Sequence, residues 1–269
     1  MKKKISKFMI VFLTLIAILF FLFPIYLAVA SSFKTPLELA ESVLKLPSTL
    51  YFDNYVEGME RSNFFRSMLN SCIVTFPSVV LIVFCSSMGG YTIARNGKRK
   101  KMIGMMDKIY LISLMIPIYR IFRALKMQNS LLAVIIVLTG TSVAYATFLY
   151  VGFVKSIPVE LEEAALIDGC GPYRTFVSIV FPMLKPITAT VAALHVMWLW
   201  NDFNISLILL QKDEVRTLTV KQYYFFGEFS SNYGMAFAAS IVCMIPVIIF
   251  FIFMQRYIVE GIAAGAVKS

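Results

Sequence analysis

Six long apolar stretches, separated by polar segments, limit what this chain can fold into more than any other feature. They cover about residues 8–30, 70–94, 102–120, 131–153, 186–210 and 236–257. A helix needs about 20 apolar residues to cross the hydrocarbon core of a bilayer, so each stretch has roughly the length of one span. Because backbone groups cannot stay unpaired in lipid, the spans must be helices. The sequence therefore predicts an all-α membrane protein with six transmembrane helices in a single domain over residues 1–269.

The distribution of charge agrees with a membrane protein and indicates its orientation. Charged residues make up only 15% of the chain, against about 25% in an average soluble domain. The net charge of +10 forms no continuous basic face, so nucleic acid is not an expected partner. Lysines and arginines cluster in residues 2–7 and 95–101. Cytoplasmic loops carry such clusters, so both termini are expected in the cytoplasm.

The first and third stretches each admit an alternative. A signal peptide also starts with positive charge, but its apolar region is usually about 7–15 residues long. The run from Phe8 to Ala30 is longer, which favours a retained span. In the third stretch, Asp107 and Lys108 either lie near the inner membrane boundary or form a polar functional site.

The chain carries few residues for catalysis or metal binding. It has four cysteines, none of them in a Cys-x-x-Cys pair, and a single histidine, so neither a disulfide framework nor a zinc site is expected. It lacks the G-x-x-x-x-G-K-[ST] pattern of a phosphate-binding loop. We therefore expect a non-catalytic subunit with no cofactor of its own, whose energy comes from a partner.

The polar break at residues 154–185 predicts two short helices joined by a Gly-Cys-Gly-Pro turn. Pro158 favours the start of the first helix, because proline suits the first helical position. Gly169 is expected to end that helix, because glycine tolerates the left-handed conformation of a C-cap. Three glutamates in the first turns complement the helix dipole: Glu160, Glu162 and Glu163.

The second helix of this break is expected to run over residues 173–181, started by Pro172 and closed by Pro182. It carries an apolar stripe at helical spacing, formed by Phe176, Ile179 and Val180.

Another protein has room to approach the first helix closely. Ala164 and Ala165 are small, and Glu163 offers a charge for a partner's arginine or lysine. The alternative is an ordinary loop that folds against the membrane.

These residues resemble the EAA loop, the signature of permease subunits of ABC importers. The resemblance is carried by Glu163-Ala164-Ala165, Gly169, Ile179 and Pro182, with Phe181 departing from the family's leucine. Other stretches resemble the carbohydrate-uptake branch, of the maltose-transporter second-permease type. They include Phe33-Lys34, Asp53-Asn54-Tyr55, Leu69-Asn70-Ser71, Trp200-Asn201-Asp202-Phe203 and Arg216-Thr217-Leu218. In the third stretch the family usually has a proline, where this chain reads Met105 to Ile109.

The resemblance implies a type I ABC importer permease in the bacterial plasma membrane. Such a subunit forms half of a pore with a second permease, expected here as a heterodimer, and an extracellular solute-binding protein delivers the sugar. Two ATP-binding subunits bind ATP and magnesium, and their closure rocks the pore between inward-open and outward-open states. The resemblance also implies that residues 261–269 reach the ATPase and that residues 211–235 meet the binding protein. The residues implied to couple to the ATPase are Glu163, Ala164, Ala165, Asp168, Gly169, Ile179 and Pro182.

The fifth stretch has the densest polar content and is the candidate substrate pathway. Its spacing places four residues on one helix face with a fifth beside it: His195, Trp198, Asp202 and Ser206, with Asn201. Aromatic planes with carboxylates and amides are typical of sugar sites, and an ionisable residue inside a membrane suggests function. The alternative is that these side chains bond neighbouring helices, or that Asp202 lies near the outer interface.

Two other functions compete with a permease subunit. A self-sufficient secondary transporter or channel favours paired inverted repeats, which are not evident in this sequence. A membrane-embedded enzyme needs clustered nucleophile, base or metal ligands, and one histidine with scattered cysteines does not supply them.

Overall fold

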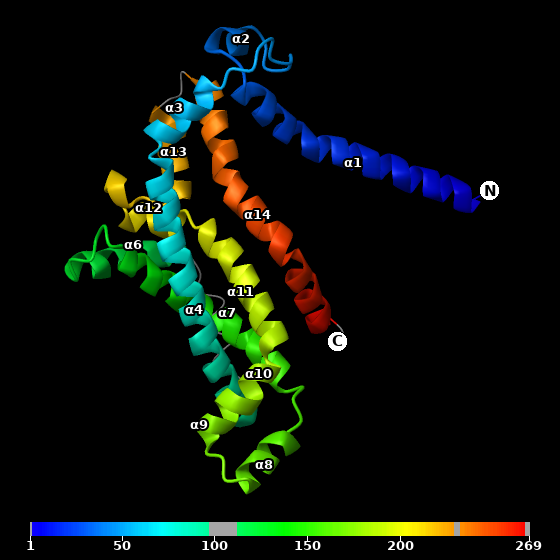
Figure 1. Ribbon diagram of the computed structural model, residues 1–269, viewed down its shortest axis with the longest axis vertical. Coiled ribbons are helices and arrows are strands. Elements are labelled where there is room, and N and C mark those ends of the chain that lie inside the picture. Colours follow the sequence, from blue (N-terminus) through cyan, green and yellow to red (C-terminus); the bar gives the residue numbers. More distant parts are fainter. Residues whose placement is uncertain (1, 97–111, 229–231, 267–269) are drawn as a thin grey trace. The chain divides into compact units, whose positions relative to one another are not determined.

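The computed structural model describes residues 2–96, 112–228 and 232–266, which are almost entirely helical and contain no strand (Figure 1). The predicted all-α fold is confirmed for these residues. They divide into two compact units, which are described separately below. The first unit comprises Met1–Phe65 with Lys221–Pro246, and the second comprises Arg66–Val220 with Val247–Ser269.

Four described helices are long and apolar enough to cross a bilayer. They are α1 (Lys2–Ser32), α4 (Phe64–Asn96), α7 (Leu131–Val154) and α14 (Tyr233–Ala266). A fifth candidate is a broken span, in which the segment Pro172–Met183 meets α11 (Lys185–Trp200) at a bend of 74°. These five match the first, second, fourth, sixth and fifth apolar stretches of the sequence.

The third predicted span is described only in part. Residues 97–111, including Asp107 and Lys108, lie outside the described residues, and α6 covers Ile112–Ala124. The count of six spans therefore stays a prediction. At the other end of the chain, α14 continues through Ala266, so the implied C-terminal tail is helical for most of its length.

The first unit holds α1, α2 (Pro36–Glu41), α3 (Asp53–Arg61) and the start of α14. A buried lysine fixes the path of the chain between these helices. The side chain of Lys34 is 1% exposed, and its Nζ donates to the carbonyl oxygens of Ser42 at 3.0 Å and Val43 at 2.8 Å. Asn54 of α3 adds two bonds from its Nδ2, to the carbonyl oxygens of Ser32 at 2.9 Å and Lys34 at 2.8 Å. We call Lys34 and Asn54 with these four bonds the Lys34 clasp.

The start of α14 packs closely against the Lys34 clasp, and only glycine fits there. A Cβ added at Gly234 would lie 2.7 Å from Asn54 Nδ2 and 3.0 Å from the Lys34 carbonyl oxygen. On α3, a Cβ added at Gly58 would lie 3.3 Å from the Met235 carbonyl oxygen. The two glycines therefore set the distance between α14 and the clasp.

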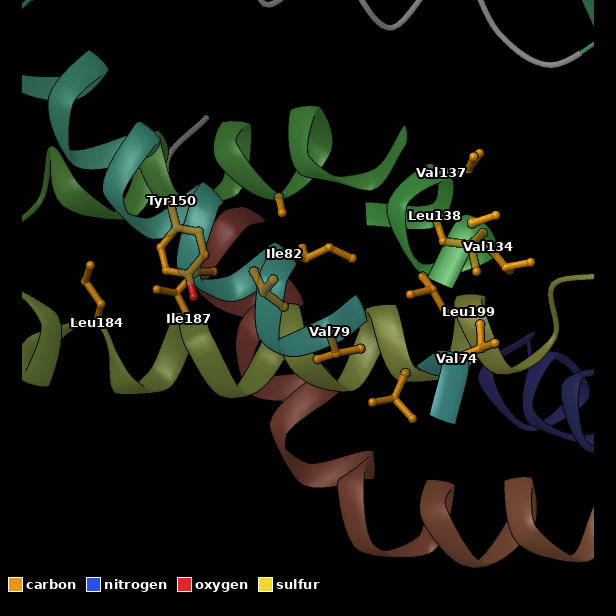
Figure 2. Close-up of a cluster of buried hydrophobic side chains, with 14 of the residues drawn as sticks. Val74, Val79, Ile82, Val134, Val137, Leu138, Tyr150, Leu184, Ile187 and Leu199 are labelled. Carbon is orange, nitrogen blue, oxygen red and sulfur yellow. The ribbon is translucent and has the colours of Figure 1, made fainter. Parts of the chain in front are cut away.

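The core of the second unit is a cluster of buried aliphatic side chains between α4, α7 and α11 (Figure 2). Lipid tails are as apolar as leucine, so inside a membrane such a cluster stabilises the unit through close packing rather than through removal from water. The closest approach is at Gly90 of α4, where a Cβ would lie 2.6 Å from Tyr150 Cβ of α7. Members of the cluster include Val74, Val79, Ile82, Val134, Leu138, Tyr150, Leu184, Ile187 and Leu199.

The fifth apolar stretch is not one continuous helix, which corrects the expectation from the sequence. After α11 ends at Trp200, the chain breaks and then forms α12 (Asn204–Leu209). A 3₁₀ turn, Asp213–Val215, and α13 (Leu218–Glu228) follow. Asn70 of α4 ties this region down, because its Nδ2 donates to the carbonyl oxygens of Glu214 at 3.0 Å and Arg216 at 3.1 Å.

Candidate functional site

The first arm of the predicted hairpin is α8, Glu160–Ile167, which lies beyond the end of α11 within the second unit (Figure 1). The helix begins two residues after Pro158, so this proline precedes the helix rather than occupying its first position. Val159 is the N-cap, and its carbonyl oxygen accepts the amides of Glu162 at 2.9 Å and Glu163 at 3.1 Å.

The turn after α8 forms in the predicted way. Gly169 has a φ of +80°, which is the left-handed region that glycine favours. The Cys170 amide bonds the Ala165 carbonyl oxygen at 2.9 Å, and the Gly169 amide bonds the Leu166 carbonyl oxygen at 3.1 Å. This pair of bonds is the Schellman motif, which satisfies the last carbonyls of the helix. The predicted role of Gly169 as a helix stop is confirmed.

The second arm differs from the single helix that was expected. It consists of α9 (Pro172–Thr175), a π-helical turn (Phe176–Val180) and α10 (Phe181–Met183), followed by the bend at Leu184. Pro182 does not close this arm, because it lies in the first turn of α10, where a missing amide hydrogen is tolerated. We refer to Glu160–Met183 as the α8–α10 hairpin.

The α8–α10 hairpin has an outer face of exposed side chains. Ile167 is 87% exposed, the highest value among the large apolar side chains of the described residues, and Leu166 and Tyr173 are also exposed. Ala165 faces inward and is buried, so only Ala164 of the two alanines leaves the backbone open to a partner. Of the other residues implied in coupling, Ile179 is half-buried, and the exposed ones are Glu163, Asp168, Gly169 and Pro182.

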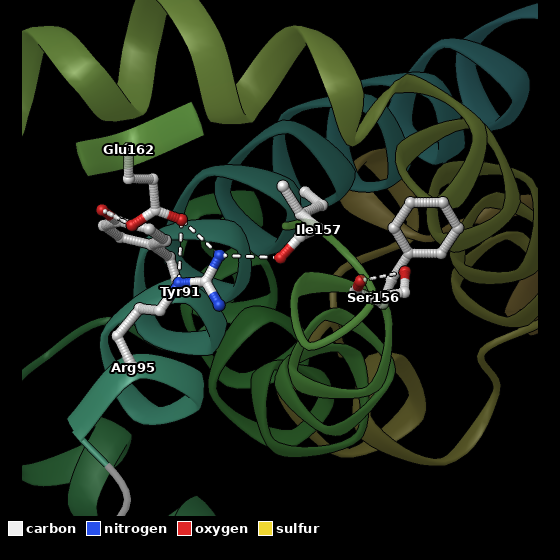
Figure 3. A network of polar contacts seen from close by, with 6 residues as sticks. Tyr91, Arg95, Ser156, Ile157 and Glu162 are labelled. Atoms are coloured by element: carbon white, nitrogen blue, oxygen red, sulfur yellow. Dashed lines mark hydrogen bonds and ion pairs between the residues drawn. The ribbon is translucent and has the colours of Figure 1, made fainter. Parts of the chain in front are cut away.

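A polar network joins α8 to the last turns of α4 (Figure 3). Glu162 Oε1 accepts from Arg95 Nε at 2.8 Å and also contacts Arg95 Nη2, while Glu162 Oε2 accepts from the Tyr91 hydroxyl at 2.9 Å. Arg95 Nη2 also donates to the carbonyl oxygen of Ile157, just before α8, at 3.2 Å. The charged side chains are only 20% exposed for Arg95 and 11% exposed for Glu162. We call Tyr91, Arg95, Ile157 and Glu162 the Glu162 network.

The end of α4 also contacts the second arm of the hairpin. The ring of Tyr91 lies against the ring of Phe176, with centroids 5.2 Å apart and an interplanar angle of 41°. Sequence reasoning missed this role of α4. The only local signal was that Tyr91 and Arg95 are four residues apart and therefore share one helix face.

The candidate substrate pathway divides into two separate groups. In the first group, His195 is fully buried, and its Nδ1 donates to the Val191 carbonyl oxygen at 2.7 Å. The centroid of its ring lies 5.3 Å from the ring centroid of Trp198 and 6.3 Å from that of Tyr145. Tyr145 belongs to α7 and was not singled out from the sequence. Trp198 is 50% exposed and Tyr145 is 39% exposed, so both are accessible, whereas His195 is not.

The second group is the cap of a short helix. Asp202 accepts from the Ser206 amide at 3.0 Å and the Ser206 hydroxyl at 2.8 Å, as a carboxylate does at a helix N-terminus. The Thr219 hydroxyl donates to the Asp202 carbonyl oxygen at 2.7 Å. Asn201 is exposed and bonds back to the Met197 carbonyl oxygen at 2.8 Å. The break after Trp200 thus separates residues that a continuous helix would have aligned.

Within the described ranges, no group of three or more histidine, cysteine or acidic side chains is arranged to hold a metal ion.

Comparison with known proteins places these features in a family. The chain matches the family described as "binding-protein-dependent transport system inner membrane component" over residues 3–263. It is 33% identical to a probable starch degradation products transport system permease of Thermoanaerobacterium thermosulfurigenes, over 100% of this chain and 99% of the relative. It is 34% identical to a melibiose/raffinose/stachyose import permease of Bacillus subtilis, over 91% of each chain.

Two solved structures have the same fold. One is a bacterial ABC transporter involved in the import of the acidic polysaccharide alginate, with a TM-score of 0.81 and 22% identity over 95% of this chain and 97% of that chain. The other is a bacterial alginate ABC transporter in complex with an alginate pentasaccharide-bound periplasmic protein, with a TM-score of 0.71 and 15% identity over 95% of this chain and 94% of that chain. At these identities the likeness concerns the fold alone.

Proposed function

The chain belongs to the family of binding-protein-dependent transport system inner membrane components, and we propose that it is the permease subunit of an ATP-driven carbohydrate importer. It is a transport subunit rather than an enzyme. Sugar as the cargo is supported by full-length relatives whose names include starch degradation products and melibiose, raffinose and stachyose. A self-sufficient secondary transporter or channel, the alternative that the sequence left open, has no comparable support.

The observation that carries the mechanism is the exposed outer face of the α8–α10 hairpin. Large apolar side chains that stay exposed next to a charged residue are typical of a protein–protein contact. Here Ile167 and Leu166 are exposed beside Glu163, which has its carboxylate free for a partner's arginine or lysine. We propose that this face docks in a cleft of an ATP-binding subunit. Ala164, Asp168 and Gly169 would lie in the contact. Ala165 and Ile179 would support it from within the hairpin, and Pro182 is exposed on the second arm.

The remaining partners follow from this assignment. Two ATP-binding subunits hold ATP and magnesium, a second permease completes the pore, and a solute-binding protein delivers the sugar from outside the cell. The proposed location is the bacterial inner membrane, with both termini and the α8–α10 hairpin in the cytoplasm, as the lysine and arginine clusters favour. In this arrangement residues 211–235 face the binding protein.

For the sugar itself, Trp198 and Asn201 are the proposed contacts, because they are the exposed members of the candidate pathway. His195 is buried against its own helix, and Asp202 and Ser206 bond each other, so we assign these three to holding the pathway in shape.

The test is sugar uptake by the whole transporter in proteoliposomes, which contain this chain with a second permease, ATP-binding subunits and a solute-binding protein from the same organism. The probes are labelled maltotriose, melibiose, raffinose and stachyose. We expect ATP-dependent uptake of at least one of them. Glu163→Gln and Gly169→Ala should abolish most uptake while ATP hydrolysis persists, because the first removes the docking charge and the second strains the left-handed turn.

Glu160→Gln is the matched control, since Glu160 is an exposed glutamate of the same helix and should leave uptake unchanged. The proposed function would be wrong if the wild-type complex took up none of the four sugars, or if this chain alone carried them without ATP.

A further inference from the structure

We propose that Glu162 is a positioning residue, which fixes the α8–α10 hairpin to the end of α4 so that the two move as one body during transport. The inference rests on the proposed function, because it assigns a role within the same coupling step. It comes from the Glu162 network, which the family pattern does not name and the sequence did not predict.

Two adjacent glutamates of α8 have opposite environments. Glu163 is exposed, whereas the Glu162 side chain is only 11% exposed and accepts hydrogen bonds from Arg95 and Tyr91 of α4. Both oxygens of the Glu162 carboxylate are engaged, one by the guanidinium and one by the hydroxyl. Charge-assisted bonds to both oxygens of a carboxylate fix its orientation as well as its distance. Glu162 is therefore unavailable to a partner, and its bonds define which face α8 turns outward.

The end of α4 holds the hairpin and the chain just ahead of it at three separate points. Arg95 bonds the backbone at Ile157 ahead of α8, Glu162 lies on α8, and Phe176 lies on the second arm against Tyr91. A body held at three points cannot pivot about any one of them. A push on the outer face of the hairpin would therefore be passed to α4 rather than lost in a rotation of the hairpin.

The α4 helix is suited to carry this motion further. It has 33 residues, Phe64–Asn96, which at a rise of 1.5 Å per residue makes it about 50 Å long. At its other end Asn70 holds the backbone of residues 214–216. Within the second unit, α4 thus joins the α8–α10 hairpin to the loop that follows α12.

Apolar packing already holds the hairpin in place, so the proposed role of Glu162 can be distinguished from a contribution to folding stability alone. Ala165, Phe176 and Val180 of the hairpin, with Leu184 directly after it, are buried. An ion pair that is largely removed from solvent is weak evidence for added stability, and orientation is a better-supported use of such pairs. Loss of the network should therefore loosen the link between ATP hydrolysis and uptake before it unfolds the chain.

The experiment measures sugar taken up per ATP hydrolysed by the whole transporter, with the same four sugars as probes. Glu162→Gln keeps the shape of the side chain and removes its charge. We expect the ratio of sugar taken up to ATP hydrolysed to fall by about fivefold or more, because fivefold is the lower end of the range typical of coupling between two sites. The ATP-binding subunits should still co-purify in wild-type amounts. Glu160→Gln again serves as the matched control and should retain the wild-type ratio.

An exchange of the two charges distinguishes the proposed role from poor folding of a single variant. Arg95→Glu alone should lower the ratio as Glu162→Gln does, and Arg95→Glu combined with Glu162→Arg should restore much of it. Restoration requires that the two positions act as a pair, which a general loss of folding would not produce.

Three outcomes would overturn the inference. A wild-type ratio in Glu162→Gln would remove the positioning role while leaving the proposed function intact. Loss of the ATP-binding subunits on purification would assign Glu162 to assembly instead of motion. Absence of ATP-dependent uptake in the wild type would remove the proposed function, and this inference with it.

Discussion

The Lys34 clasp and the Glu162 network, one in each unit, hold short helices in place by different chemistry. In the Lys34 clasp, an ammonium and an amide donate only to backbone carbonyls. In the Glu162 network, most bonds join one side chain to another, and the charged groups are paired. A clasp on the backbone fixes the path of the chain whatever side chains its partners carry. A network between side chains instead depends on two particular residues, so it can be weakened or exchanged without altering the backbone.

Because the Lys34 clasp holds the backbone itself, we expect the largest loss of stability from a substitution of Lys34. Lys34→Met keeps the aliphatic stem but leaves two carbonyl oxygens without their charged donor, and hydrogen bonds to charged groups contribute about 1.5–3 kcal/mol each. We expect a loss of about 3 kcal/mol in the free energy of unfolding, measured by chemical denaturation in detergent. Lys45→Met, at an exposed lysine of the same segment, is the control. Equal stability of the two variants would show that the clasp does not hold the first unit together.

The second prediction tests the close approach of α14 to the Lys34 clasp. Gly234→Ala places a Cβ 2.7 Å from Asn54 Nδ2, so the amide must move off its carbonyl partners, and overpacking of this kind costs about 1–3 kcal/mol. Gly227→Ala is the matched control, because nothing lies within 4 Å of a Cβ there and alanine favours the helix. A thermal denaturation midpoint that falls equally in both variants would contradict this account.

A smaller effect is expected from the hydroxyl in the Glu162 network. Tyr91→Phe keeps the ring against Phe176 and removes one donor to Glu162, which should cost about 1 kcal/mol. The effect should largely vanish in a Glu162→Ala background, because the hydroxyl then has lost its partner. Denaturation of the four members of this double-mutant cycle measures the coupling. Additive losses would mean that Tyr91 acts independently of Glu162.

The smallest predicted effect is an acid response at α2 in the first unit. Hydrogen bonds from the Ser48 hydroxyl, the Thr35 amide and the Ser48 amide hold the pKa of Glu38 below its ordinary value. A lowered folded-state pKa means that this contribution is present above the unfolded pKa of about 4.3 and is lost as pH falls through the folded value. Hydrogen exchange of the α2 amides should therefore quicken on acidification below about pH 4, after correction for the intrinsic exchange rate. In Glu38→Gln this additional change should be absent, and its persistence there would exclude Glu38 as the cause.

The sequence predicts those features of the molecule that depend on local pattern. Long apolar stretches appear as long helices, and the Gly169 turn forms as expected, because hydropathy and glycine's backbone freedom act over a few residues. The break after Trp200 was not predicted, although Asn201, Asp202 and Asn204 interrupt the apolar run there. Asp202 was placed on one face of a continuous helix, whereas it in fact accepts the Ser206 amide at the start of a new one. The second arm was predicted as one helix, because the pattern does not separate a π turn from an α turn.

The Glu162 network could not be predicted from the sequence, for a different reason. Arg95 and Glu162 are 67 residues apart, so no spacing rule links them. Three glutamates of α8 look alike in the sequence, and only the packing of α4 against α8 buries one of them. The choice between Glu162 and Glu163 is therefore a property of the tertiary structure.

The π turn at Phe176–Val180 has a consequence for how chains of this kind change length. A π turn holds one residue more than an α turn, so the chain can lose a residue there and close into ordinary helix while both flanking segments keep their faces. In α8, which is a regular α-helix, no extra residue is present, so a deletion there would rotate the following side chains by about 100° around the helix axis. Single-residue deletions among relatives should therefore gather in Phe176–Val180 and spare the eight residues of α8.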